Sequence, residues 1–346
     1  MENKKIRVAI TQGDTNGIGY ELIFKTFETP EMLELCTPVV YGSPKVAAYH
    51  RKALDIETQF SIVSSAEEAR PGRLNLLTCF DDEVKIEFGR PTPESERAAQ
   101  RAVERALDDQ LKDAFDMLVA LPQSKNLFAG SQRYADDGLR LAVDGDLRIG
   151  FATDKMGLRD ALAAITKDGI VKKGTALFNT LRRDFSISNP RIAVLALNPD
   201  GAGEEERTII KPAVDELNEK NIHAFGPYKA EELFAQSDYD AFDAILAMHY
   251  EQGALPSKTL SRGEGVTVHV GMPFVCTEVN AAGQAGKGLC DPSPLRYAIY
   301  AAIDIYRNRV AYDRPMGNPL PKLYHEKRDE GEKLRFSIPK KREAKE

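Results

Sequence analysis

The sequence predicts an α/β fold built on a largely parallel sheet. Short apolar runs, most of them followed by Gly, Pro, Asn or Asp, alternate along the chain with segments of helical spacing. Because these runs are apolar at consecutive positions, both faces of each strand are expected to lie under helices, as in parallel sheets. In chain order the expected strands are Ile6–Ile10, Val39–Tyr41, Leu74–Leu77, Met117–Ala120, Arg148–Ala152, Ile192–Leu197 and Ala244–Met248.

One segment between these strands, Thr92–Lys112, shows a complete helical pattern. Thr92 is suited to cap the helix, and Pro93 fits the first helical position, where no backbone N–H is needed. Apolar residues then recur at helical spacing, at Ala99, Ala102, Val103, Ala106 and Leu107. Further along, the stretch that begins with Gly265–Thr277 alternates as a strand in its first part and runs on to a loop of small residues at Ala285–Gly288.

Length and composition restrict the class of protein. The chain has 346 residues, 42% hydrophobic and 29% charged, which excludes fibrous and wholly disordered proteins and suggests two domains. The formal net charge of -6 offers no positive field to a nucleic-acid backbone. No apolar run approaches the roughly 20 residues of a transmembrane helix, and the amino terminus does not resemble a signal peptide. We therefore expect neither a nucleic-acid nor a membrane partner.

The cysteines and the C-terminal segment add two expectations. The four cysteines lie far apart without a CxxC pair, so neither a zinc site nor a disulfide framework is indicated and the expected location is cytoplasmic. After about Asn318 the composition becomes charged, and the tail 321–346 is expected to be an exposed terminus.

Ligands of open α/β sheets gather in loops beyond the carboxyl ends of strands. The first such loop, Ile10–Glu21, is a Gly-rich turn that lacks both the dinucleotide fingerprint and a P-loop, so a ligand contact and a plain helix-capping turn both remain open. The second, Leu197–Glu206, ends in three glutamates that suit a helix N-terminus. Asp200 lies before that helix, where strand-end ligands usually project.

The third loop, Met248–Gly253, places His249, Tyr250 and Glu251 side by side. Such a density of titratable groups at a strand end indicates a functional site, although a single histidine is more often structural. Just downstream, Lys258 is either a surface lysine or a fixed positive charge for a phosphate or carboxylate. Ala285–Gly288 is a loop of small residues that would suit a flat cofactor or another backbone.

At these same loops the chain resembles the NAD-dependent 4-hydroxythreonine-4-phosphate dehydrogenase family of vitamin B6 biosynthesis, the PdxA-like proteins. The shared motifs keep one order from Ile10 to about Arg309, and include Leu118–Lys125, Leu158–Asp160, Leu197–Pro199, Gly226–Tyr228, Met248–Lys258 and Ala285–Gly288. The resemblance implies an isocitrate or isopropylmalate dehydrogenase-like fold of two α/β/α domains with a cleft between them. It divides the chain into 1–120 plus 255–320, the cofactor side, and 121–254, followed by the tail.

The family oxidises a secondary alcohol with NAD and then releases carbon dioxide, while a divalent metal held by histidines polarises the oxygen. Here the resemblance fails at polar positions. The Pro-Gly-His-Thr-Glu run has no counterpart between Lys125 and Leu147, and Lys155, Asp200 and Tyr250 stand where the family has histidines. Thr267 replaces an asparagine, Cys276 replaces an arginine, and Asn280–Gly283 lacks a further histidine. The fold is therefore expected to be kept, and the family reaction to be lost or altered.

Carried over residue by residue, the resemblance implies a set of site residues. The candidate substrate contacts are Lys258, Thr267, Lys125 and Asp14, and the candidate cofactor contacts are Gly286 and Gly288. No metal is expected at the degenerate positions Asp200 and Tyr250 or at their neighbours His249 and Glu251. If the strand continues past Met248, its alternation turns Tyr250 into the cleft and His249 towards packing or solvent. The catalytic residues remain unassigned.

Three hypotheses for the function follow. The chain is an enzyme with altered chemistry, a non-catalytic binding protein that pairs with an active paralogue, or a weakly active family dehydrogenase. In the first, Asp200, His249 and Glu251 form an oxygen-rich site suited to magnesium or manganese. The resemblance also implies NAD as cofactor, a small phosphorylated hydroxy acid as ligand, and a homodimer whose active site takes residues from both subunits.

Overall fold

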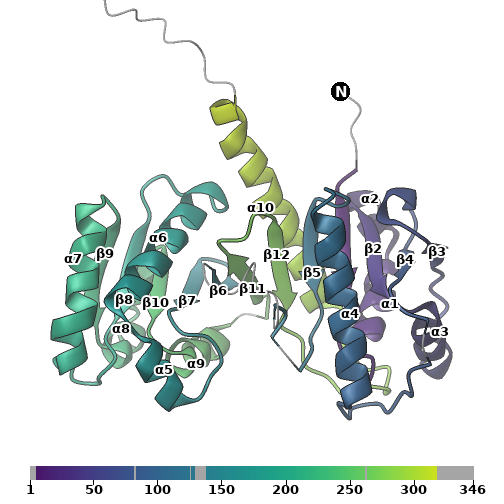
Figure 1. Cartoon of the computed structure of the whole chain (residues 1–346), viewed down its shortest axis with the longest axis horizontal. Coiled ribbons are helices and arrows are strands. Elements are labelled where there is room, and N and C mark those ends of the chain that lie inside the picture. Colours follow the sequence, from purple (N-terminus) through teal and green to yellow (C-terminus); the bar gives the residue numbers. More distant parts are fainter. Residues whose placement is uncertain (1–4, 82, 125, 129–137, 262, 318–346) are drawn as a thin grey trace, which may run out of the picture.

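A computed structural model describes residues 5–81, 83–124, 126–128, 138–261 and 263–317. They form one twelve-stranded mixed sheet with helices on both faces (Figure 1). Across the sheet the strands are β3 (Ser61–Val63), β4 (Asn75–Thr78), β2 (Thr37–Gly42), β1 (Arg7–Thr11), β5 (Met117–Ala120), β12 (Val275–Val279), β11 (Val266–Val270), β6 (Leu139–Asp144), β7 (Leu147–Phe151), β10 (Ala244–Ala247), β8 (Arg191–Leu195) and β9 (His223–Tyr228). The predicted α/β class is confirmed.

Parallel pairing dominates each half of the sheet. The strands from β3 to β12 are parallel to one another, and so are those from β7 to β9. The two halves meet through β11 and β6, which pair antiparallel with both of their neighbours. All seven apolar runs form strands, with boundaries shifted by at most two residues. The stretch Gly265–Thr277 contains strand β11 and the start of strand β12.

The helices are amphipathic and cover the sheet. They are α1 (Gly19–Phe27), α2 (Pro30–Leu35), α3 (Pro44–Ala53), α4 (Pro93–Gln110), α5 (Leu158–Ala164), α6 (Lys167–Arg183), α7 (Lys211–Glu219), α8 (Ala230–Ala235), α9 (Tyr250–Leu260) and α10 (Ser293–Gly317). The predicted start of α4 is confirmed, because Thr92 accepts a hydrogen bond from the backbone N–H of Ser95 and Pro93 is the first helical residue. None of the described helices combines the length and apolar character needed to cross a membrane.

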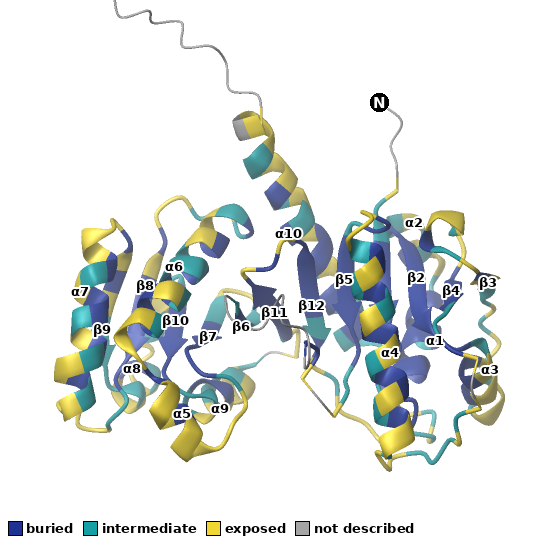
Figure 2. Ribbon diagram, in the orientation of Figure 1, coloured by how far each residue is buried: buried dark blue, intermediate teal, exposed yellow. Residues whose placement is uncertain are grey.

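The hydrophobic core differs between the two faces of the sheet. On one face a single core runs under α1, α3, α6, α7 and α10. On the other face the core is split into a cluster beneath α4 and a second cluster beneath α8 and α9. Figure 2 shows the buried strands between these layers and the exposed outer faces of the helices. The space between the two clusters on the split face is where the sheet can present side chains to a ligand.

The long helix α10 connects the two halves. It packs on β12 and β5 and also reaches α6. Arg309 on α10 forms a two-pronged ion pair with Asp184 at the end of α6, with N–O distances of 2.7 and 2.8 Å. Both side chains are buried, and Arg309 also donates to the carbonyl of Met272. The charges therefore satisfy each other where the two halves meet.

Candidate functional site

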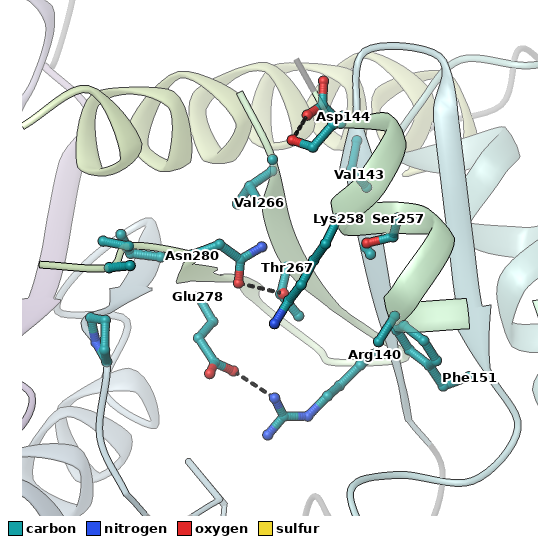
Figure 3. Close-up of a pocket in the computed structure, with 18 of the residues that line it drawn as sticks. Arg140, Val143, Asp144, Phe151, Ser257, Lys258, Val266, Thr267, Glu278 and Asn280 are labelled. Carbon is teal, nitrogen blue, oxygen red and sulfur yellow. Dashed lines mark hydrogen bonds and ion pairs between the residues drawn. The ribbon is translucent and has the colours of Figure 1, made fainter. Parts of the chain in front are cut away.

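A cavity of about 480 Å³ lies on the split face of the sheet, between β6, β7, β11 and β12 on one side and α9 on the other (Figure 3). Its polar character follows from strand alternation. Val266, Val268 and Val270 point into the continuous core, while the intervening Thr267 and His269 point to the other face. The polar and charged residues that line the cavity are Gln123, Arg140, Asp144, Lys155, Tyr250, Ser257, Lys258, Ser261, Thr267, Glu278 and Asn280.

Arg140, Glu278 and His269 form a charged network across β6, β12 and β11. The guanidinium Nη1 of Arg140 donates to Oε2 of Glu278 at 3.0 Å, and Nε2 of His269 lies 3.2 Å from the same oxygen. The Nε of Arg140 also lies 3.0 Å from Oδ1 of Asp154. Burial raises the pKa of Glu278, but the hydrogen bond with His269 and the charge of Arg140 oppose it and leave the pKa at about 2. Glu278 is therefore ionised at neutral pH.

Two lysines add positive charge to the cavity. The Lys258 side chain extends from α9 toward Thr267 (Figure 3), and within the described chain it has no ion pair or hydrogen bond. Thr267 donates to Oδ1 of Asn280 at 3.1 Å, which leaves the amide nitrogen of Asn280 available. The ammonium of Lys155 lies 5.3 Å from the ring centroid of Tyr250, a cation–π contact. A lysine ammonium beside a hydroxyl and an amide can bind a phosphate or a carboxylate.

Tyr250 of the third loop lines the cavity, but it does so as a helix residue and not through the strand alternation considered above. Strand β10 ends at Ala247 and Tyr250 is the first residue of α9, so strand alternation does not extend to His249 and Tyr250. Gln252 fixes this turn: it accepts from the N–H of Met248 and donates to the carbonyl of Ala196. Burial raises the pKa of Tyr250, so its phenol stays protonated. His249 and Glu251 are not among the residues that line the cavity.

The second loop does not reach the cavity either. Asp200 is exposed, and its carboxylate accepts the N–H of Ala202 in a local turn. Glu206 has a structural role, because one of its oxygens accepts the N–H groups of Leu197 and Asn198, each at 2.7 Å. The structure thus does not bring Asp200, His249 and Glu251 together at this cavity. The oxygen-rich site that these three residues would form is not supported by their placement.

The first loop and the Gly286–Gly288 loop also lie outside the cavity lining. Asp14 accepts the N–H of Asn16 at 2.8 Å, as a turn residue does. A side chain at Gly286 would collide with Phe88, so packing explains this glycine, whereas the space around Gly288 is open. A dinucleotide that approaches this loop would therefore meet backbone at Gly288. Lys125 lies outside the described residues.

The residues present do not fit a divalent metal. At the two positions where the resemblance implies metal ligands, the chain has an exposed aspartate, Asp200, and a protonated phenol, Tyr250. Lys155, which replaces a further histidine of the family, places its ammonium over the ring of Tyr250. The described residues contain no group of three or more His, Cys, Asp or Glu side chains that could hold an ion.

Arg140 and Glu278 were missed in the sequence, although a signal was present. In Leu139–Asp144 and Val275–Val279 the residues that enter the continuous core alternate with those that do not, as in a strand with one apolar face. Asp144-Gly145-Asp146 between β6 and β7 is a hairpin turn, and Gly145 has a φ of +59°, which suits glycine. Treating both segments as strands would have placed Arg140 and Glu278 on the same face as Thr267.

Comparisons with known proteins give a consistent result. The family model described as pyridoxal phosphate biosynthetic protein PdxA matches residues 34–302. The 4-hydroxythreonine-4-phosphate dehydrogenase of Bacteroides thetaiotaomicron is 45% identical over 358 aligned positions, which cover 97% of this chain and 98% of that protein. The D-threonate 4-phosphate dehydrogenase of Cupriavidus necator is 29% identical, with 88% of this chain and 98% of that protein covered.

A solved structure supports the fold. The 4-hydroxythreonine-4-phosphate dehydrogenase from Klebsiella pneumoniae matches with a TM-score of 0.71 at 24% identity, over 88% of this chain and 99% of that one. The expected isocitrate dehydrogenase-like fold is thereby confirmed.

Proposed function

Because this chain belongs to the PdxA family of pyridoxal phosphate biosynthetic proteins, we propose that its cavity binds a small phosphorylated acid and that the family's metal-dependent oxidation is lost. Two relatives are dehydrogenases of 4-hydroxythreonine 4-phosphate and of D-threonate 4-phosphate, which are both short acids with a terminal phosphate. The observation that carries the proposal is a cavity lined by Arg140, Lys155 and Lys258, in which the ammonium of Lys155 lies over the ring of Tyr250.

Lys258 is the residue proposed to hold the phosphate. Its ammonium has no described partner, and its side chain extends toward Thr267, beside Asn280. A dianion that enters this corner would meet one full positive charge and the amide N–H groups of Asn280, whose oxygen is held by Thr267. We assign the ligand's phosphate to Lys258 and Asn280, with Thr267 as the residue that orients Asn280.

Family membership also implies NAD. The proposed contact is the open face of Gly288, on a loop that Lys25 holds by donating to the carbonyls of Gly288 and Cys290 at 2.8 and 2.9 Å. NAD would supply an acceptor for hydride when bound. The residues of this loop would do no more than position it through the backbone.

A second candidate function is the family dehydrogenase itself at low rate. The 45% identity with the Bacteroides enzyme over nearly the whole chain favours this reading. The two candidates differ in one measurable property, because only the dehydrogenase would form NADH from a phosphorylated hydroxy acid.

Replacing Lys258 tests the proposed anion site. With 3-phosphoglycerate as probe, we expect Lys258→Met to weaken binding by about tenfold to a hundredfold, since a charged hydrogen bond contributes roughly 1.5–3 kcal/mol. Isothermal titration calorimetry measures the change. Lys211→Met is the matched control, because Lys211 lies on α7 and pairs with Asp215 away from the cavity. Equal losses in both variants, or none in Lys258→Met, would refute the assignment of the phosphate.

Assembly is a separate prediction. We propose that the chain forms a homodimer and expect about twice the mass of one chain by light scattering at micromolar concentration. The exposed apolar side chains Met156, Leu158, Leu162 and Leu255 support this, because all four lie on or next to α5 and α9, which lie close together at the lower edge of Figure 2. Leu158→Glu together with Leu255→Glu should then yield monomer. A wild-type monomer would contradict the proposal and would also weigh against pairing with a paralogue.

A further inference from the structure

Glu278 is an ionised carboxylate in the wall of a cavity that is also lined by Arg140, Lys155 and Lys258. It lies on β12 and its side chain is 19% exposed. Its Oε2 lies 3.0 Å from Nη1 of Arg140 and 3.2 Å from Nε2 of His269. Within the described residues, Oε1 has no hydrogen-bond donor. One half of the carboxylate is therefore fixed, and the other half is available to a ligand.

Arg140 does not need a carboxylate at position 278 to neutralise its charge. Asp154 already lies 3.0 Å from the Nε of Arg140, and its other oxygen accepts from Asn126 at 3.1 Å. A neutral residue at position 278 would leave this ion pair intact. Placing a second carboxylate here has a cost, because a partly buried negative charge repels any acid that enters the cavity. That repulsion becomes an attraction for a ligand that carries a positive charge.

We propose that Glu278 is a specificity-determining residue, whose Oε1 accepts a hydrogen bond from an ammonium group of the ligand. This rests on the proposed function, in which Lys258 holds the phosphate of the same ligand. Figure 3 shows the side chains of Lys258 and Asn280 ending beside Thr267, with the carboxylate of Glu278 below them and joined to Arg140. A ligand that carries both a phosphate and an ammonium group complements this arrangement, whereas one with a hydroxyl in place of the ammonium loses a charged partner.

Two small phosphorylated acids test the proposed contact between Glu278 and an ammonium group. O-Phosphoserine and 3-phosphoglycerate have the same carbon skeleton, but phosphoserine carries an ammonium group on the carbon where 3-phosphoglycerate carries a hydroxyl group. By calorimetry on the full chain, we expect phosphoserine to bind about tenfold more tightly. In Glu278→Gln the affinity for phosphoserine should fall and that for 3-phosphoglycerate should rise, so that the preference disappears or reverses.

Asp144→Asn provides the matched control. Asp144 is the other carboxylate that lines the cavity, but it accepts a hydrogen bond from Ser261, so its replacement should leave the preference unchanged. The wild-type comparison needs no variant and stands even if Glu278→Gln does not fold. Equal wild-type affinities, or a preference that survives Glu278→Gln, would overturn the role of Glu278 and leave the proposed function intact. Failure of both probes to bind wild-type protein would overturn both.

Discussion

The purified protein, supplied with 4-hydroxythreonine 4-phosphate, NAD and Mg²⁺, Mn²⁺ or Zn²⁺, is expected to form NADH at least about a thousandfold more slowly than the Bacteroides relative, because loss of groups that act on the reacting atoms commonly costs several powers of ten. The physical reason lies in the cavity. Tyr250 stands where the resemblance implies a metal ligand, and Lys155 places a positive charge over its ring. Absorbance at 340 nm measures the rate.

The Bacteroides enzyme, assayed in the same buffer, controls for substrate and cofactor quality. The metal content of both proteins is measured as well. It distinguishes slow turnover because no metal is bound from slow turnover in a site that does bind metal. Metal-dependent turnover within tenfold of the relative's rate would show that the family reaction survives and would favour the second candidate function.

Breaking the buried pair between Arg309 and Asp184 is expected to have the largest effect on stability. Arg309→Leu should lower the free energy of unfolding by about 3–5 kcal/mol, because it leaves Asp184 charged, buried and without its partner. Guanidinium denaturation followed by circular dichroism measures the change. Replacing both residues, as in Asp184→Leu with Arg309→Leu, should recover much of the loss, since no isolated charge remains.

The neighbouring pair between Arg183 and Asp313 offers an internal comparison. It joins the same two helices, but its side chains are 37% and 48% exposed. Exposed pairs contribute about 0–1 kcal/mol, so Arg183→Met should change stability by no more than that. Similar losses in Arg183→Met and Arg309→Leu would show that helix contact matters here and that charge burial does not.

The sequence predicts the strands of the two parallel halves well and the centre of the sheet poorly. Runs such as Met117–Ala120 are apolar on both sides, and hydrophobicity alone identifies them. The central strands β6 and β12 alternate, because one face is buried in the core and the other faces the cavity or its rim. The polar residues of these strands, which line the site, interrupt the apolar pattern by which a strand is recognised in the sequence.

The candidate site was predicted in part for the same reason. Lys258, Thr267 and Tyr250 follow motifs that the family resemblance identifies, and all three line the cavity. Arg140 and Glu278 have no such motif, and only their pairing across neighbouring strands shows that they belong together. Asp200 shows the limit of strand-end reasoning, because its position after a strand does not determine the direction of its side chain, which is held in a local turn.

The position of β12 beside β5 sets an order for synthesis of the protein. The two strands are neighbours in the sheet, yet about 155 residues of chain separate them. At roughly 5–20 residues per second, the ribosome needs on the order of 8–30 seconds to make that stretch. Throughout this interval β5 can pair with β1 but not with β12, so the edge that β12 later occupies stays open. The apolar side chains of β5 that later pack against α10 are also uncovered. The nascent N-terminal half thus presents an open strand edge, the type of surface that chaperones shield from aggregation.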